Sequence, residues 1–215
     1  MLKTVFFDLD GTLTDSADGI IASLKYALDK YGIEEKDESV LRKFLGPPIS
    51  DKACEIYGVS KKDGDLIVEY YREFFVEKGM FINKVYDGVP QMLDKLKKLG
   101  KKIVLATSKP EIHAIEILKK FEIYKYFDFS VGATLDGSLN KKDEVIAHAI
   151  KRANALKESS IMVGDTYYDV LGGRANGLKT VAVTYGYNSA LELKKALPDY
   201  TVDTVTELEK LLMEI

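Results

Sequence analysis

The spacing of apolar positions divides the chain into two kinds of segment. Between residues 16 and 81, apolar side chains recur at helical spacing and no stretch is typical of a strand. In the rest of the chain, short apolar runs alternate with helical patterns. Strands are expected at 5–7, 103–106, 127–131, 160–163, 180–183 and 200–202, and helices at 89–99, 111–121, 140–153, 169–176, 189–197 and 205–214. This alternation predicts an α/β fold with a parallel sheet covered by helices on both faces.

The helical stretch interrupts the α/β pattern directly after the first strand. We therefore expect an α/β core made of residues 1–15 and 82–215, and an inserted all-helical domain of residues 16–81. Four helical segments are expected in the insert: 16–31, around 40–44, 50–57 and 63–78. Because the insert follows the carboxyl end of a strand, it is expected to form a lid above that end of the sheet.

Composition narrows the class of protein. The chain has 215 residues, of which 46% are hydrophobic and 30% charged, with a net charge of -3. This balance is typical of a globular protein and argues against a general nucleic-acid or membrane-surface binder. A single cysteine, Cys54, excludes an internal disulfide, and no apolar run approaches the roughly 20 residues of a membrane span. No signal peptide is recognisable, so we expect a cytoplasmic protein.

Reactive side chains follow three of the predicted strands. Asp8 and Asp10 end the first strand, Thr107 and Ser108 end the next, and Asp165 ends a later one. In a parallel sheet these strand ends lie at one edge, where ligands of open α/β sheets bind. Asp169 follows Asp165 by four residues, a spacing that brings side chains together when a helix begins between them. Helix capping would explain one of these aspartates, but not four that meet at one edge.

The acids predict a cation site. Like charges this close are unfavourable unless a cation or a proton lies between them. Carboxylate oxygens without histidine or cysteine partners favour Mg²⁺ over zinc, and the two histidines lie in predicted helices away from the strand ends. Lys142 shares the inward face of its helix with Val145, Ile146 and Ala149, so we expect it to reach the site, although a solvated Lys141–Lys142 pair is the alternative.

These residues resemble the four motifs of the haloacid dehalogenase superfamily. The motifs are DLDGT at 8–12, Thr107 after an apolar strand, Lys142, and GDTYYD at 164–169. The helical insert after the first motif, with FLGPP at 44–48, is similar to the cap of the subgroup that contains phosphoglycolate phosphatases. The resemblance implies a Rossmann-like core with a helical cap.

The resemblance also implies an activity, a Mg²⁺-dependent hydrolysis of a small phosphomonoester through an aspartyl-phosphate. Asp8 would be the nucleophile and Asp10 the general acid and base. Mg²⁺ would be held by Asp8, the Asp10 carbonyl and Asp165, with Asp169 in support. The residues expected to bind the phosphate or the rest of the substrate are Thr12, Thr107, Ser108, Lys109 and Lys142.

Two other functions stay open at this point. A phosphomutase of the same fold would share all of these residues. A phospho-accepting signalling module without turnover is disfavoured by Asp10 and by the inserted domain. The expected partner is a small phosphorylated metabolite, with phosphoglycolate, a nucleoside monophosphate, a sugar phosphate and pyrophosphate as candidates. We expect a monomer.

Overall fold

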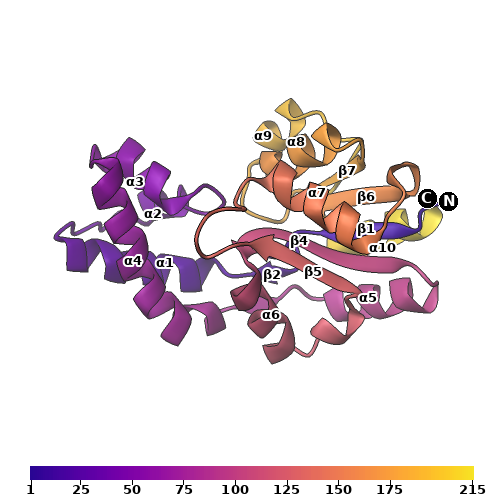
Figure 1. Cartoon of the computed structure of the whole chain (residues 1–215), viewed down its shortest axis with the longest axis horizontal. Helices are drawn as coiled ribbons and strands as arrows, with labels where there is room; N and C mark the ends of the chain where they lie inside the picture. The colour runs from indigo at the N-terminus through magenta and orange to yellow at the C-terminus, as the bar shows by residue number, and fades with distance from the viewer. The chain divides into compact units, whose positions relative to one another are not determined.

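The computed structural model describes all residues from 1 to 215, and the chain divides into two compact units (Figure 1). One, the α/β unit, comprises residues 1–15 and 85–215, and the other, the helical unit, comprises residues 16–84. The second boundary falls at residue 85, where the sequence pattern placed it at 82. A short strand at this boundary, β3 (Lys84–Val85), pairs with β2 (Thr14–Asp15), and the helical unit ends a few residues later than expected.

The α/β unit is built on a six-stranded sheet in the order β5-β4-β1-β6-β7-β8, in which every neighbouring pair is parallel. β1 lies between β4 and β6, and all four of its residues are buried, as its continuous apolar run predicts. The predicted parallel α/β sheet is therefore confirmed. The strands are β1 (Thr4–Phe7), β4 (Lys102–Pro110), β5 (Phe129–Ala133), β6 (Ser160–Gly164), β7 (Lys179–Val183) and β8 (Tyr200–Val202).

Helices cover both faces of this sheet (Figure 1). α7 and α8 lie on one face, where α7 packs against a cluster of buried side chains that includes Phe6, Val104 and Met162. α5 and α6 lie on the other face. The helices of the unit are α5 (Val89–Lys98), α6 (Glu111–Lys120), α7 (Lys142–Ala153), α8 (Tyr167–Ala175), α9 (Ala190–Lys195) and α10 (Val205–Glu214).

Several elements begin or end one or two residues from the expected position, and the end of β4 differs by four residues. β4 continues past Ala106 to Pro110, because its pairing with β5 resumes after a register shift between Thr107 and Pro110. The position before α5 is Gly88, which has a φ of 89°, and no side chain caps the helix there. Gly88 tolerates this left-handed conformation because it has no Cβ atom.

The helical unit contains α1 (Ala17–Tyr31), α2 (Glu38–Arg42), α3 (Ile49–Tyr57) and α4 (Lys61–Glu77). α1 and α3 end at the expected residues 31 and 57, and each is followed by a left-handed glycine, Gly32 or Gly58. α4 begins two residues earlier than expected because the Ser60 side chain accepts a hydrogen bond from the Asp63 amide. Tyr71 and Phe75 are buried and stacked, with ring centroids 5.2 Å apart, so this aromatic face packs inside the unit.

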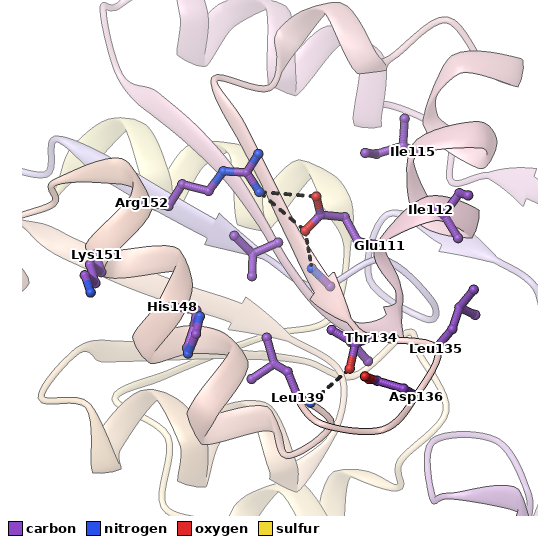
Figure 2. A pocket seen from close by; sticks show the side chains of 13 residues that line it. Glu111, Ile112, Ile115, Thr134, Leu135, Asp136, Leu139, His148, Lys151 and Arg152 are labelled. Carbon is purple, nitrogen blue, oxygen red and sulfur yellow. Dashed lines mark hydrogen bonds and ion pairs between the residues drawn. The ribbon is translucent and has the colours of Figure 1, made fainter.

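A groove runs along the edge strand β5 of the α/β unit, between α6 and α7 (Figure 2). Across it, Arg152 contacts Glu111 at 3.2 Å and donates to the Ser130 carbonyl at 2.9 Å, while Glu111 accepts from the Gly132 amide. These charges tie both helices to the edge strand. None of the aspartates that end the strands lines this groove. No helix of the protein combines the length and apolar character needed to cross a bilayer.

Candidate active site

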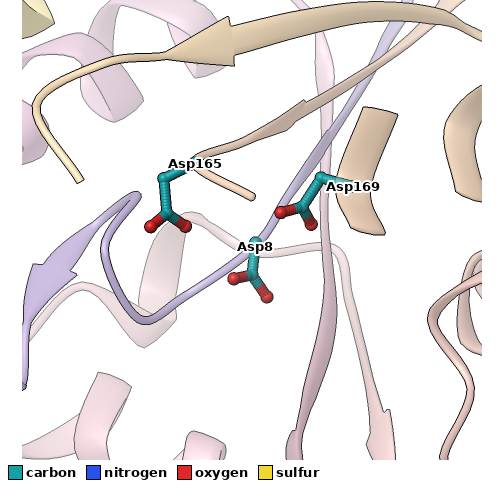
Figure 3. A group of neighbouring side chains, drawn as sticks. All are labelled: Asp8, Asp165 and Asp169. Carbon is teal, nitrogen blue, oxygen red and sulfur yellow. The ribbon is translucent and has the colours of Figure 1, made fainter. Parts of the chain in front are cut away.

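Three aspartates from distant parts of the sequence meet at the carboxyl end of the sheet (Figure 3). Asp8 follows β1, Asp165 follows the neighbouring strand β6, and Asp169 lies in the first turn of α8. One carboxylate oxygen from each lies within 4.8 Å of the others, and all three residues are buried. The adjacency of β1 and β6 thus brings together acids that are more than 150 residues apart in the chain.

Lys142 enters this cluster from the first turn of α7. Its Nζ atom lies 2.6 Å from Asp8 Oδ1 and 2.7 Å from Asp169 Oδ1, and only 5% of its side chain is exposed. Burial alone would lower the pKa of Lys142, but the charges of Asp169 and Asp8 outweigh burial and raise the pKa above its ordinary value. The lysine therefore stays charged and fixes both carboxylates.

Asp169 also caps the helix on which it lies. Its Oδ2 atom accepts hydrogen bonds from the Thr166 amide at 3.0 Å and the Thr166 hydroxyl at 2.7 Å. Burial raises the pKa of Asp169, and the charge of Lys142 opposes that shift. A Cβ atom at Gly164 would overlap the Asp169 side chain, so glycine is needed at the end of β6. The Asp169 carboxylate thus both caps α8 and contacts Lys142.

Asp165 is held between two glycines. A Cβ atom at Gly11 or at Gly186 would overlap its side chain. Its Oδ1 atom accepts from the Thr12 hydroxyl at 3.2 Å, and its Oδ2 atom accepts from the Tyr187 amide at 2.8 Å. Burial, with the nearby charges of Asp169 and Asp8, raises the pKa of Asp165 well above its ordinary value.

Thr12, which is expected to bind the substrate or its phosphate, contacts Asp165. It is fully buried, and its hydroxyl donates to Asp165 rather than being displayed toward a substrate. The reason is the turn at Gly11, which has a φ of 77° and brings the following residue beneath the end of β6. Thr12 therefore supports Asp165, and its expected contact with phosphate stays a prediction.

The segment from Tyr185 to Asn188 was missed in the sequence. The Tyr185 hydroxyl donates to the Thr12 carbonyl at 3.0 Å, and Asn188 Oδ1 accepts from the Tyr167 amide at 3.0 Å. With the Tyr187 amide on Asp165, the segment braces the site from the end of β7. The strand-end rule, applied to the strand at 180–183, would have pointed to it.

Asp10 lies in a different environment from Asp8. Its side chain is not part of the three-aspartate cluster; instead Oδ2 lies 2.9 Å from Lys109 Nζ. Only 19% of the Asp10 side chain and 6% of the Lys109 side chain are exposed. The other oxygen, Asp10 Oδ1, is buried and has no hydrogen-bond partner. The two acids of the first motif are therefore matched with two different lysines.

Thr107 and Ser108 lie at the end of β4, on the strand next to β1. Thr107 is buried, and its hydroxyl accepts from the Lys109 amide at 3.2 Å, which holds the irregular end of the strand. Ser108 is exposed. Both expected residues thus reach the same sheet edge as the aspartates, with Ser108 the more accessible.

The donor set fits a hard divalent cation. The three clustered ligands are carboxylates, with no histidine or cysteine among them. The four aspartates and two buried lysines together carry a formal charge of about minus two at neutral pH, which one divalent cation would cancel. The raised pKa of Asp165 has the same origin, since burial and its neighbours' charges oppose its ionisation.

Comparison with known proteins agrees with this geometry. A solved structure, described as a predicted phosphatase from Clostridium acetobutylicum, is 45% identical, with a TM-score of 0.96 and complete coverage of both chains. A protein from Pseudomonas aeruginosa named 5'-nucleotidase is 36% identical over 208 residues, which is 97% of this chain and 94% of that protein. A protein from Mycobacterium tuberculosis named tyrosine-protein kinase PtkA is 38% identical over 87% of this chain, which spans 64% of that protein.

The family model for haloacid dehalogenase-like hydrolases matches residues 5–183, a range that includes all four motifs. As those motifs predicted, the chain belongs to the haloacid dehalogenase-like hydrolase family.

Proposed function

We propose that this protein is a Mg²⁺-dependent phosphatase that hydrolyses a small phosphomonoester through an aspartyl-phosphate on Asp8. The observation that carries the proposal is the separation of the two acids of the first motif. Asp8 lies against Lys142 within the carboxylate cluster, whereas Asp10 lies against Lys109 outside it. Two carboxylates two residues apart, in different surroundings, suit two different tasks.

In this mechanism the Asp8 carboxylate attacks phosphorus, and the bond between phosphorus and the ester oxygen breaks. Asp10 gives a proton to the departing oxygen, and then takes one from the water that attacks the phosphoenzyme. That second attack breaks the bond between phosphorus and Asp8 and releases inorganic phosphate. Lys142 fixes the rotamer of Asp8 through Oδ1 and offsets charge on the phosphoryl group.

Asp8, Asp165 and the Asp10 carbonyl would hold Mg²⁺, with Asp169 in support. When bound, the ion would offset the charge of a phosphate dianion that four aspartates otherwise repel. The Thr12 hydroxyl and the Tyr187 amide keep Asp165 oriented for this task. We assign the helical unit, residues 16–84, the part of the cap that the family resemblance implies.

The test is phosphate release from p-nitrophenyl phosphate in Mg²⁺ and in EDTA, with variants of both acids. Asp8→Asn should abolish turnover and leave no phosphoenzyme, because the nucleophile is gone. Asp10→Asn should still form phosphoenzyme, which accumulates because its hydrolysis is slowed, and intact-mass spectrometry would detect it. Asp136→Asn, at an exposed aspartate of the same unit, is the control. Equal residual activity in the Asp8 and Asp10 variants would refute the assignment.

The relative named as a tyrosine-protein kinase favours a second candidate, transfer of the phosphoryl group to an acceptor other than water. A phosphomutase would be one such enzyme. Both functions form the same phosphoenzyme and differ in what removes the phosphoryl group. Adding a hydroxylic acceptor to trapped phosphoenzyme distinguishes them: formation of a new ester faster than inorganic phosphate supports transfer. No phosphate release or phosphoenzyme at any pH would favour a binding module.

A further inference from the structure

The end of β4 is built to place Lys109. The strand's register against β5 shifts between Thr107 and Pro110, and such irregularities re-aim side chains next to active sites. The Lys109 amide donates to the Thr107 hydroxyl at 3.2 Å. A Cβ atom at Gly132 would lie 2.6 Å from the Lys109 carbonyl oxygen, so glycine on β5 allows the shifted segment to approach closely. The position of Lys109 is therefore specified by contacts on both strands.

The two buried lysines of the site serve different ends of the reaction. Lys142 contacts Asp8 and Asp169, and so lies where the phosphoryl group is attacked. Lys109 contacts Asp10, 2.9 Å away, and Asp10 is the acid that meets the departing oxygen in the proposed mechanism. The buried Asp10 Oδ1 atom has no partner within the protein. The ammonium group of Lys109 is thus the cation beside the leaving group.

From this arrangement we propose that Lys109 is a specificity-determining residue that selects phosphomonoesters whose leaving group carries its own negative charge close to the ester oxygen. The inference rests on the proposed function, because it uses the role of Asp10. The chemistry recognised is a carboxylate, or a second phosphate, one or two bonds beyond the departing oxygen. A neutral leaving group, such as the ribose of a nucleoside 5'-monophosphate, lacks that charge.

The physical reason is the charge balance at this edge of the sheet. A substrate that brings an extra anion meets four aspartates, and Lys142 is already engaged with two of them. A lysine ammonium group has three donors, so Lys109 can contact Asp10 and a substrate anion together. Because only 6% of its side chain is exposed, solvent screens this contact weakly. Lys109 therefore favours the anionic leaving group over a neutral one of the same shape.

The test compares two substrates that differ in one charge, 2-phosphoglycolate and its neutral amide, carbamoylmethyl phosphate. Pyrophosphate forms a second anionic arm, and adenosine 5'-monophosphate a second neutral one. Each is assayed in Mg²⁺ with the wild type, Lys109→Met, Lys109→Arg and Lys141→Met. Lys141 is the matched control, because it precedes Lys142 but its side chain is 71% exposed.

We expect the wild type to prefer the anionic substrate. Lys109→Met should reduce the ratio of the kcat/KM values for the charged and the neutral substrate by about tenfold to hundredfold, which is the range for a hydrogen bond to a charged group. Lys109→Arg should retain part of the preference, and Lys141→Met all of it. The ratio cancels any effect of the substitution on Asp10 that is equal for both substrates. If the wild type prefers phosphoglycolate but not pyrophosphate over the neutral substrates, the recognised group is a carboxylate. If it prefers pyrophosphate but not phosphoglycolate, the recognised group is a phosphate.

A wild type that prefers neither phosphoglycolate over its amide nor pyrophosphate over adenosine 5'-monophosphate would overturn the inference and leave the proposed phosphatase intact. A preference that is unchanged in Lys109→Met would overturn it too. A tenfold or greater preference for adenosine 5'-monophosphate over both anionic substrates would also overturn it. If the wild type releases phosphate from neither the four compounds nor p-nitrophenyl phosphate, the proposed function itself fails. The two failures are therefore distinguishable in one set of assays.

Discussion

Replacing Asp165 by asparagine should stabilise the metal-free protein while removing its response to Mg²⁺. The asparagine side chain would keep the shape of the aspartate and both of its hydrogen bonds: its carbonyl can accept from the Tyr187 amide, and its amide can donate to the Thr12 hydroxyl. What the substitution removes is a buried negative charge. The effect therefore isolates the electrostatic cost of building the site.

The magnitude follows from the cluster's geometry. Asp165 faces Asp8 and Asp169, with oxygens within 4.8 Å, and the charge of Lys142 cancels one of those two neighbours. One remaining like charge at that distance costs about 3 kcal/mol at an effective dielectric constant of about 20. For a protein of this size, that corresponds to a rise in Tm of roughly 6 to 12 °C.

The effect should depend on pH with a definite sign. The folded-state pKa of Asp165 lies well above the ordinary value of 3.8, so the folded protein binds more protons than the unfolded chain between the two values. Stability from this group is fully present below 3.8 and is lost as the pH rises through the folded-state pKa. The gain from Asp165→Asn should accordingly be largest at neutral pH and shrink toward pH 4.

Thermal unfolding followed by circular dichroism, at pH 7.5 and pH 4.5 in EDTA and in Mg²⁺, measures these effects. The control is Asp136→Asn: hydrogen bonds from Thr134 and Ser138 lower the pKa of Asp136 to about 2, so its stabilisation is present at neutral pH and lost on acidification. Asp136→Asn should therefore not raise Tm at pH 7.5. An Asp165→Asn variant that melts at or below the wild-type temperature in EDTA would show that like-charge repulsion does not dominate at this position.

Three further outcomes are expected. Lys142→Met should lower the free energy of unfolding by about 3 to 5 kcal/mol in EDTA, because it leaves the buried carboxylates of Asp8 and Asp169 unpaired. Urea titration would measure this loss, and a loss below about 1 kcal/mol would contradict the pairing. Gly186→Ala should weaken Mg²⁺ binding, measured calorimetrically, by about tenfold to hundredfold, because its Cβ atom displaces Asp165; unchanged affinity would argue against Asp165 as a ligand. Ser60→Ala should cost about 1 kcal/mol through loss of the α4 cap, with Mg²⁺ affinity unchanged.

The sequence predicts most of the fold because the local signals agree with the tertiary structure. The apolar run at 5–7 becomes the buried central strand, and Gly32 and Gly58 end helices in the left-handed conformation that glycine favours. The two largest boundary errors, at the end of β4 and at residue 85, lie where strands pair. The polar end of β4 is typical of a loop, yet pairing with Ala133 extends the strand to Pro110.

The candidate site divides in the same way. Asp8 and Asp165 could be found because both directly follow apolar strands, and Lys142 because it lies on the apolar face of its helix. The contacts that Asp10 and Asp165 make with other residues could not be predicted from the sequence. Lys109 contacts Asp10 from the end of β4, where the strand's register shifts. The Tyr187 amide contacts Asp165 from the segment after β7, where the sequence signals are only the strand end and Gly186.

The net negative charge of the four aspartates and two lysines gives a reason for the different positions of Lys109 and Lys142. A second lysine inside the carboxylate cluster would stabilise the metal-free protein, but it would also compete with Mg²⁺ for Asp165. Lys109 instead contacts Asp10, outside the cluster. In the proposed function, this leaves the carboxylates of the cluster available to a divalent ion. Folding and metal binding are then linked: once the free Mg²⁺ concentration exceeds the dissociation constant, each tenfold increase adds about 1.4 kcal/mol to the free energy of unfolding. In the proposed Mg²⁺ site, the negative charge that destabilises the metal-free protein would be the charge that attracts the divalent cation.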